Sequence, residues 1–243
     1  MKRTPILMYH NVDSAINESL SSLYVTPHEF ARQLNALHAL GFWCVSLVNA
    51  LPFIRENRRE RIAVITFDDG YKDTLENALP ILIQYGFSAT CFVVSGLIGK
   101  TNSWDGQLTA SRPLMNAENI RQWHSAGMEI GAHSRTHRNL QTLDDVSVKE
   151  EVEGSKSDLE EILQTEVSSF AYPFGQYDDK CRSAVISAGY TAAVTASVRR
   201  SCRHYDMFAL PRIGVVNRSS LLFRILLTNI MPDPIFRRLF PKI

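Results

Sequence analysis

The stretch IAVITFDDGYKD (residues 62–73) places two adjacent carboxylates, Asp68 and Asp69, directly after six mostly apolar residues. The apolar run indicates a buried strand, so the pair is expected where that strand reaches the surface. Adjacent carboxylates raise each other's pKa, and burial penalises both charges. A bound metal ion would relieve this cost, because it would neutralise one aspartate and leave the other free to act as a base.

Outward from this strand, short apolar runs alternate with helical patterns along the whole chain. Strands are predicted at 5–9, 43–47, 62–67, 88–94, 128–132, 167–172, 190–195 and 209–215, and helices at 26–41, 74–86, 116–127, 144–163 and 178–188. Thr26 and Asn116 are the expected N-caps of two of these helices. Strands that alternate with helices pair in parallel through right-handed crossovers, so we expect an α/β fold.

About seven or eight strand–helix units favour a closed, irregular (β/α)7–8 barrel over an open sheet. The sequence contains no repeat, low-complexity segment or Gly/Ser linker. A single domain is therefore expected, with the barrel over 1–218 and a basic, apolar C-terminal helix and tail over 219–243.

Composition and targeting signals indicate a cytoplasmic globular enzyme. The 243 residues are 45% hydrophobic and 21% charged, which is enough to build a large core. The four cysteines lie far apart without a Cys-x-x-Cys pair, which argues against a zinc knuckle or a disulfide framework. The N-terminal segment has too few apolar residues for a signal peptide, and no run is long enough to span a membrane.

Polar residues follow the predicted strands, where a barrel of this kind places its chemistry. His10 follows 5–9, the two aspartates follow 62–67, and His133 follows 128–132. In HSRTH, His133 and His137 are four residues apart, close enough to converge on one ion. With one carboxylate of the pair they would provide three ligands and leave positions open, which is typical of a catalytic metal site.

Three motifs, TFDDG, HSRTH and FAYPFG, resemble in this order the first three motifs of the NodB-homology polysaccharide deacetylases, carbohydrate esterase family 4. The resemblance extends over about 5–215 and includes WDGQ (104–107) and GMEIGAHS (127–134). It implies an irregular barrel, with Asp68 as the general base. It also implies Asp69, His133 and His137 as ligands of a divalent metal, usually zinc, and the Tyr172 N–H in an oxyanion hole.

The chain departs from the family pattern in two places. The arginine that usually begins the third motif is absent, and we expect Arg212 in LPRIGV to replace it. The late Leu-x-His motif is also absent, because no histidine follows His204. LMYH (7–10) instead resembles the permuted subgroup that acts on poly-β-1,6-N-acetylglucosamine, which implies His10 as the general acid. The first and last strands of a closed barrel are neighbours, so such a permutation can preserve the position in space.

Tyr71, Trp104 and Pro173 are predicted to contact the substrate. Either aromatic ring could stack on a sugar face or cover the core instead, and the sequence leaves both interpretations open.

These features predict a metal-dependent hydrolase that removes N-acetyl groups from amino sugars of a polysaccharide or glycan precursor, as in exopolysaccharide biosynthesis. Two alternatives stay open: hydrolysis of O-acetyl esters on a polysaccharide, and a barrel that binds glycan without cleaving it.

The segment from Arg199 to Ile243 has nine basic and two acidic residues, a surplus of seven positive charges. Residues 219–243 could form a helix packed on the barrel, or contact an anionic membrane surface from the cytoplasmic side. The second possibility predicts a lipid-linked or nascent saccharide as substrate. No nucleic acid is expected as a partner, because no recognised binding motif accompanies the charge.

Overall fold

The computed structural model describes residues 4–14, 23–58, 60–105, 111–196 and 206–215. The predicted boundary at 218 and the tail 219–243 lie outside the described residues, so both stay predictions. Three of the four cysteines lie in the described part, namely Cys44, Cys91 and Cys181, and each is a buried free thiol.

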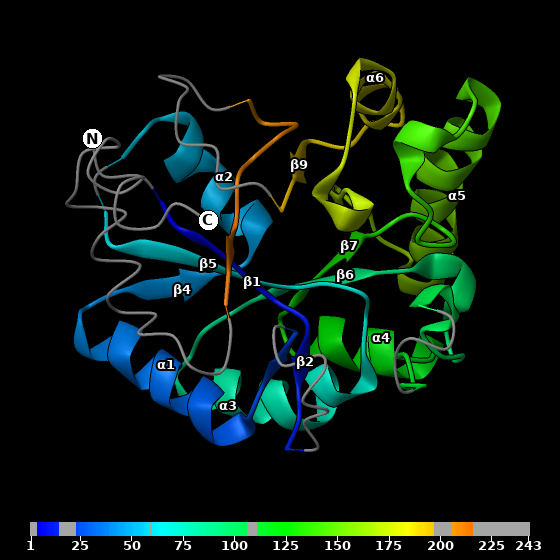
Figure 1. Ribbon diagram of the computed structural model, residues 1–243. Helices are drawn as coiled ribbons and strands as arrows, with labels where there is room; N and C mark the ends of the chain where they lie inside the picture. Colours follow the sequence, from blue (N-terminus) through cyan, green and yellow to red (C-terminus); the bar gives the residue numbers. More distant parts are fainter. Residues whose placement is uncertain (1–3, 15–22, 59, 106–110, 197–205, 216–243) are drawn as a thin grey trace, which may run out of the picture.

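The described strands form one curled, parallel sheet of eight strands and a separate pair (Figure 1). The sheet order is β10 (Ile213–Gly214), β1 (Ile6–Tyr9), β5 (Ile62–Phe67), β6 (Thr90–Val93), β7 (Glu129–Ala132), β8 (Ser169–Ala171) and β9 (Ala192–Val194), with β4 (Trp43–Val45) also paired to β5. The short strands β2 (Asn11–Val12) and β3 (Tyr24–Val25) pair with each other.

One segment of chain joins the two ends of this sheet. Leu210 forms a parallel bridge with Val194 of β9, and a few residues later Ile213 of β10 pairs with Leu7 of β1. Residues 206–215 therefore close the sheet into an irregular barrel, which confirms the predicted α/β barrel in a single domain.

Helices surround the sheet, and most of them begin where the sequence predicts (Figure 1). They are α1 (Pro27–Ala39), α2 (Leu47–Arg55), α3 (Leu79–Gln84), α4 (Ala117–Ser125), α5 (Asp145–Leu163) and α6 (Asp179–Ser187), with a π-helical turn at Thr74–Ala78 before α3. The Thr26 hydroxyl accepts a hydrogen bond from the Glu29 N–H, and Asn116 forms a capping box with Asn119. Each described helix is too short or too polar to cross a bilayer.

Helix α2 and the pair β2–β3 were not predicted. Residues 47–55 contain Pro52, whose missing N–H argues against a helix, yet the helix forms because Leu47, Leu51 and Ile54 are buried on it. These three residues belong to an apolar cluster with Val64 and residues of five other strands, which fills the barrel interior. Tertiary burial thus outweighs the local signal.

The alternation of side chains along β5 determines what faces the barrel interior. Ile62 and Val64 belong to the inner cluster, whereas Ala63, Ile65 and Phe67 pack in the larger core that includes residues of α1, α3 and α4. Successive side chains of a strand point to opposite faces. Thr66 and Asp68 therefore continue the inner row beyond Val64.

Candidate active site

Asp68 and Arg212 form a buried, two-pronged ion pair at the carboxyl end of β5. The two terminal nitrogens of Arg212 donate to the two carboxylate oxygens of Asp68, each at 2.6 Å, and Nη1 also donates to the Thr66 hydroxyl at 3.1 Å. The Arg212 Nε donates to the Thr195 carbonyl at 3.0 Å. Arg212 is 1% exposed, so the guanidinium is held on all sides. The structure thus places Arg212 where the sequence predicted a replacement for the absent third-motif arginine.

Asp69 lies beside the two histidines of HSRTH. Its Oδ1 is 3.5 Å from His133 Nε2 and 3.4 Å from His137 Nε2, and the three ligand atoms lie within 4.8 Å of one another. Zinc–ligand bonds of about 2.0–2.2 Å in a tetrahedral arrangement put neighbouring ligand atoms about 3.4 Å apart. The predicted ligand set is therefore brought together at a spacing that fits a divalent ion.

The second ring nitrogens of the two histidines differ. His133 Nδ1 lies 2.7 Å from the Ala171 carbonyl, which accepts a hydrogen bond from the Nδ1–H and so directs Nε2, the ligand atom, toward Asp69. His137 Nδ1 is buried without a hydrogen-bond partner among the described residues. The His137 ring instead packs between Trp104 and Phe174, with centroid distances of 4.5 and 4.7 Å.

Burial and charge shift the pKa values of this group in different directions. Burial would raise the pKa of Asp68, but Arg212 and His133 outweigh it and hold that pKa below its usual value. The pKa of Asp69 is also lowered, because its contacts with His133 and His137 outweigh burial. Burial lowers the pKa of His137 to about 4, so this imidazole is neutral and able to bind a metal at physiological pH.

Left-handed backbone conformations turn these side chains toward one another. Asp69 has a φ of 73°, Ser134 of 61° and His137 of 58°, values that are uncommon for residues with a side chain. Gly70 follows at φ 76°, and a Cβ there would approach Val93 Cγ1 to 3.3 Å. Strained positions of this kind persist where the surroundings fix them, and they cluster at functional sites.

Helix α5 fixes the loop between the two histidines. One carboxylate oxygen of Glu151 accepts hydrogen bonds from the N–H groups of Arg135 and Thr136, both at 2.9 Å, and the other accepts from the Thr136 hydroxyl. The Ser134 hydroxyl accepts from the His137 N–H at 3.0 Å. Glu151 carries no motif signal, and only its place on the buried face of a long helix could have suggested the role.

His10 directly follows β1, whose last residue, Tyr9, pairs with Phe67 of β5. The imidazole is therefore at the same edge of the barrel as Asp68, and it is close enough for its charge to lower the pKa of both Asp68 and Asp69. The structure thus places His10 beside the carboxylate pair, as the sequence predicted.

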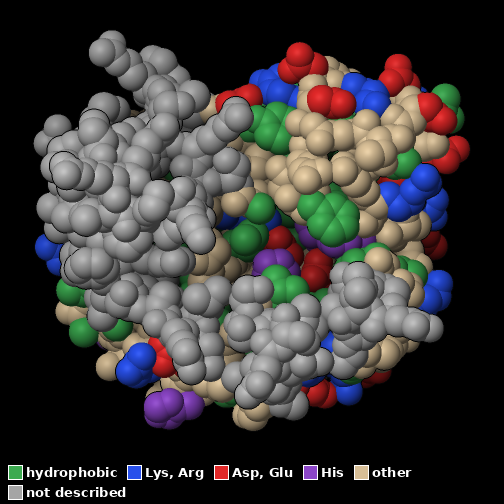
Figure 2. Space-filling model, viewed as in Figure 1, with side chains coloured by type: hydrophobic (Ala, Val, Ile, Leu, Met, Phe, Trp, Pro, Cys, Tyr) green, Lys and Arg blue, Asp and Glu red, His purple; other side chains and the backbone are tan. Residues whose placement is uncertain are grey.

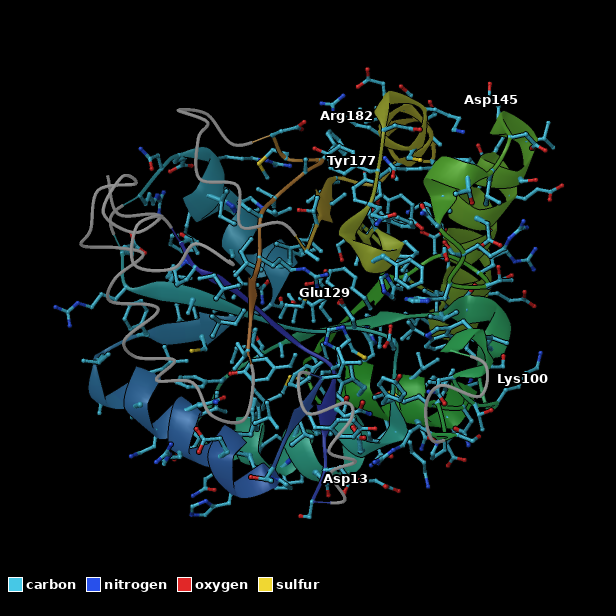
Figure 3. The ribbon with its side chains drawn as sticks, viewed as in Figure 1. Asp13, Lys100, Glu129, Asp145, Tyr177 and Arg182 are labelled. Carbon is cyan, nitrogen blue, oxygen red and sulfur yellow. The ribbon has the colours of Figure 1, made fainter. Side chains whose placement is uncertain are left out.

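The third motif requires a correction. The Tyr172 N–H donates to the Val194 carbonyl at 3.2 Å within the sheet, so it is not available to an oxyanion as the sequence predicted. The Tyr172 ring is buried and stacks on the Tyr177 ring at a centroid distance of 4.9 Å. Figure 3 labels Tyr177. The N–H groups of Gly175 and Gln176 donate to the carbonyls of Tyr172 and Pro173. The Phe174 N–H is then the backbone donor of this turn that has no acceptor among the described residues.

The residues predicted to contact substrate separate into buried and accessible ones. Tyr71 is 3% exposed and Pro173 is buried, so neither offers a free face, and Tyr71 lies behind Trp104 at a centroid distance of 6.5 Å. Trp104 is partly exposed, and Phe174, which was not predicted, is 55% exposed. Figure 2 shows a hollow in this face, with acidic and histidine side chains at its base and hydrophobic side chains at its edge.

A family model for polysaccharide deacetylases matches residues 55–193, more than half of the chain. The chain belongs to the polysaccharide deacetylase family. This family member is 28% identical over 215 residues to Bacillus subtilis YxkH, which is named as a polysaccharide deacetylase. The aligned region covers 88% of this chain and 71% of YxkH. It is 24% identical over 220 residues to the poly-beta-1,6-N-acetyl-D-glucosamine N-deacetylase of Staphylococcus epidermidis, over 89% of this chain and 76% of the relative.

Solved structures share the fold of this polysaccharide deacetylase family member. The Streptococcus pyogenes deacetylase PplD aligns with a TM-score of 0.79 at 24% identity, over 95% of this chain and 99% of PplD. IcaB from Ammonifex degensii aligns with a TM-score of 0.77 at 20% identity, over 94% of this chain and 97% of IcaB. These alignments extend beyond the motifs to nearly the whole chain, in agreement with the resemblance found in the sequence.

Proposed function

We propose that the protein is a metal-dependent hydrolase that removes N-acetyl groups from amino sugars of a polysaccharide or glycan precursor. The observation that carries this proposal is the arrangement at the end of β5. Asp68 is held ionised by Arg212, while the adjacent Asp69 lies 3.4–3.5 Å from the Nε2 atoms of two histidines. Two neighbouring carboxylates with different partners can take the two roles of base and ligand.

Asp69, His133 and His137 would hold the ion, and two imidazoles with one carboxylate suit zinc. When bound, a divalent ion supplies Lewis acidity to the acetyl carbonyl and lowers the pKa of water at the site. His137 is already neutral, so its Nε2 is free for a ligand bond. Burial lowers the pKa of His133, but Asp69 and Asp68 outweigh it and raise that pKa, so an ion would displace a proton from His133 Nε2 while the Ala171 carbonyl keeps the Nδ1–H in place.

The remaining groups move protons and bind the transition state. Asp68 would take a proton from the attacking water as its oxygen forms a bond to the carbonyl carbon. The carbon–nitrogen bond then breaks, and His10 would give a proton to the leaving nitrogen, so that an amine and acetate result. The Phe174 N–H is a donor that could stabilise the oxyanion.

The substrate class rests on the relatives. A related chain is named a poly-beta-1,6-N-acetyl-D-glucosamine N-deacetylase, and we extend an N-acetylated glycan to this protein. Trp104 and Phe174 beside His137 provide apolar surfaces for sugar rings at the edge of the site. O-acetyl ester hydrolysis needs the same groups and is the second candidate reaction.

A barrel that binds glycan without cleaving it was suggested by the absent arginine of the third motif. Arg212 supplies two hydrogen bonds to Asp68 from another segment, which favours an enzyme over a binding protein.

The test is release of acetate by the purified, metal-loaded protein. N-acetylglucosamine oligomers and acetylated xylan are the substrates, each with and without a chelator. We expect acetate from the oligomers, lost with chelator and restored by zinc. Release from xylan alone would favour the esterase, and saturable glycan binding without release would establish the binding protein.

We also propose that the substrate is a lipid-linked or nascent saccharide at the inner membrane face, within exopolysaccharide biosynthesis. It is supported by the basic and apolar composition of residues 219–243.

A further inference from the structure

The imidazole of His10 forms no hydrogen bond with any residue in the described part of the chain. A histidine that transfers protons usually has its ring oriented by a second group that binds the other ring nitrogen. No described side chain does this for His10. Within the described residues, hydrogen bonds instead fix the backbone that carries the ring and so its place beside the carboxylate pair.

That backbone is fixed by Asp73, which lies in the same motif as the carboxylate pair. One Asp73 oxygen accepts a hydrogen bond from the Asn11 side-chain amide at 2.8 Å. The other accepts from the Val12 N–H at 3.2 Å. A single carboxylate thus binds both residues that follow His10.

Two neighbours of Asp73 extend this attachment. The Thr74 hydroxyl is 3.5 Å from the His10 carbonyl, which it can reach as a donor. The Asn77 side-chain amide donates to the Val12 carbonyl at 2.8 Å. The π-helical turn Thr74–Ala78 and the segment after β1 are consequently tied together at three successive residues of that segment, His10 to Val12.

The attachment is built into the protein interior rather than formed at its surface. Asn11 is 2% exposed, and Thr74 is fully buried. Charge-assisted hydrogen bonds that amide N–H groups donate to a carboxylate are about twice as strong as neutral ones and fix direction as well as distance. Residues 68–73 therefore contain the proposed base, one proposed metal ligand and the group that holds the segment after His10.

We propose that Asp73 is a positioning residue for His10, holding the imidazole opposite Asp68 so that it can give its proton to the leaving nitrogen. The inference rests on the proposed function, in which His10 is the general acid. Asp73 touches neither substrate nor metal in this account and acts through the backbone of residues 11 and 12.

Leaving groups separate this role from a merely structural one. When an acetamide is hydrolysed, the carbon–nitrogen bond breaks and the nitrogen must be protonated as it leaves. When an activated aryl acetate is hydrolysed, the phenolate leaves without a proton. Loss of a correctly placed His10 should thus slow the first reaction far more than the second, whereas partial unfolding or metal loss should slow both alike.

The experiment compares Asp73→Asn, His10→Ala and the double variant on N-acetylglucosamine oligomers and p-nitrophenyl acetate, with zinc content measured in each. For Asp73→Asn we expect unchanged zinc, kcat on the oligomers lowered about ten- to a hundredfold, and kcat on the aryl ester within about twofold of the wild type. The double variant should be no slower than His10→Ala. Equal loss on both substrates, or a further loss in the double variant, would overturn the proposal.

Asp144→Ala is the control for a purely structural loss. Asp144 caps α5 by accepting from the Ser147 N–H, so this variant should unfold at a lower urea concentration and show no preference for either substrate. If Asp73→Asn does not fold, Asn11→Ala, which removes one of the two hydrogen bonds to Asp73, should give the same preference to a smaller degree. The absence of that preference would overturn the proposal.

The outcome also distinguishes this inference from the proposed function. If the wild type releases no acetate from either substrate, the proposed function fails and takes the inference with it. If His10→Ala loses only the amide reaction while Asp73→Asn matches the wild type on both substrates, the function stands and the inference alone fails.

Discussion

Arg212 binds both carboxylate oxygens of Asp68, although the two residues are 144 positions apart in the sequence. Arg212 lies one residue before β10, and Asp68 lies one residue after β5. The pair is buried, so its two charges depend on each other rather than on water.

The first prediction concerns this pair. Arg212→Met should lower the free energy of unfolding by about 3–5 kcal/mol, because it leaves the Asp68 charge buried without a partner. Arg212→Lys should fall between the wild type and Arg212→Met, since lysine keeps the charge but cannot form the two parallel hydrogen bonds. Urea unfolding measures the free energy of unfolding of each variant, and acetate release measures its turnover. A loss below about 1 kcal/mol in Arg212→Met would show that the pair contributes little.

The second prediction separates the proposed base from the proposed ligands. His133→Ala should lose both zinc and turnover, because it removes one of three ligands. Asp68→Asn should keep zinc and lose turnover. His124→Ala, which changes an exposed histidine on α4, is the matched control and should keep both. Metal analysis after dialysis, together with acetate release, checks all three, and full activity in Asp68→Asn would refute its assignment as base.

The third prediction concerns Phe174, the exposed ring against His137. Phe174→Ala should raise KM for N-acetylglucosamine oligomers by several fold, because the loss of an aromatic contact weakens binding by about 0.5–1.5 kcal/mol. Zinc content should stay constant, because the ring is not a ligand. Trp43→Ala is the control, because Trp43 is a similarly exposed ring, 56% exposed, on β4. No candidate site residue lies on β4. A similar rise in KM in both variants would contradict a contact specific to Phe174.

The fourth prediction follows from the pKa of Asp73, which burial raises to about 6. Between pH 4 and 6 the folded protein then binds more protons at this site than the unfolded chain, so this site makes the folded state less stable as pH rises through that range. In metal-free protein, the wild type should lose about 2 kcal/mol relative to Asp73→Asn between pH 4 and 7. Urea unfolding across this range measures the difference.

Asp144 provides a control of opposite sign for this pH dependence. The Ser147 N–H lowers the pKa of Asp144, so its contribution is present above the unfolded pKa and is lost as pH falls through the folded pKa. The difference between wild type and Asp144→Ala should therefore grow as pH rises. A difference between wild type and Asp73→Asn that does not change with pH would show that Asp73 titrates normally.

The fifth prediction concerns residues 219–243. If they contact an anionic membrane surface, the full-length protein should sediment with membranes at low salt and be released at high salt, since salt screens basic contacts. A variant that ends at Met231 should remain in the supernatant. A full-length protein that stays in the supernatant at low salt, or a shortened one that sediments equally, would exclude the membrane contact.

Local signals in the sequence predicted most of the fold and the three candidate metal ligands. Strand β5 and its two aspartates, and the caps Thr26 and Asn116, lie where the pattern placed them, because apolar runs and capping residues act over a few positions. His133 and His137 converge on Asp69 because parallel strands end at one edge.

Features that depend on distant contacts could not be predicted in the same way. Helix α2 forms around Pro52 because its apolar residues fill the barrel interior, which no local pattern shows. The Tyr172 N–H was predicted to face substrate, but pairing with β9 occupies it, and that pairing depends on the sheet register. Glu151 and Asp73 hold neighbouring loops through hydrogen bonds that become visible only in the folded chain.

The position of Arg212 in the segment that closes the barrel has a consequence during synthesis. Asp69, His133 and His137 have all left the ribosome well before residues 206–215 are made, so a growing chain can present the complete ligand group while Asp68 still lacks its arginine. β10, the last strand of the part of the chain that the structure describes, then completes both the sheet and the ion pair. A chain that ended before residue 206 would keep the proposed metal ligands but lack the arginine that holds the proposed base, so we expect no hydrolysis from it.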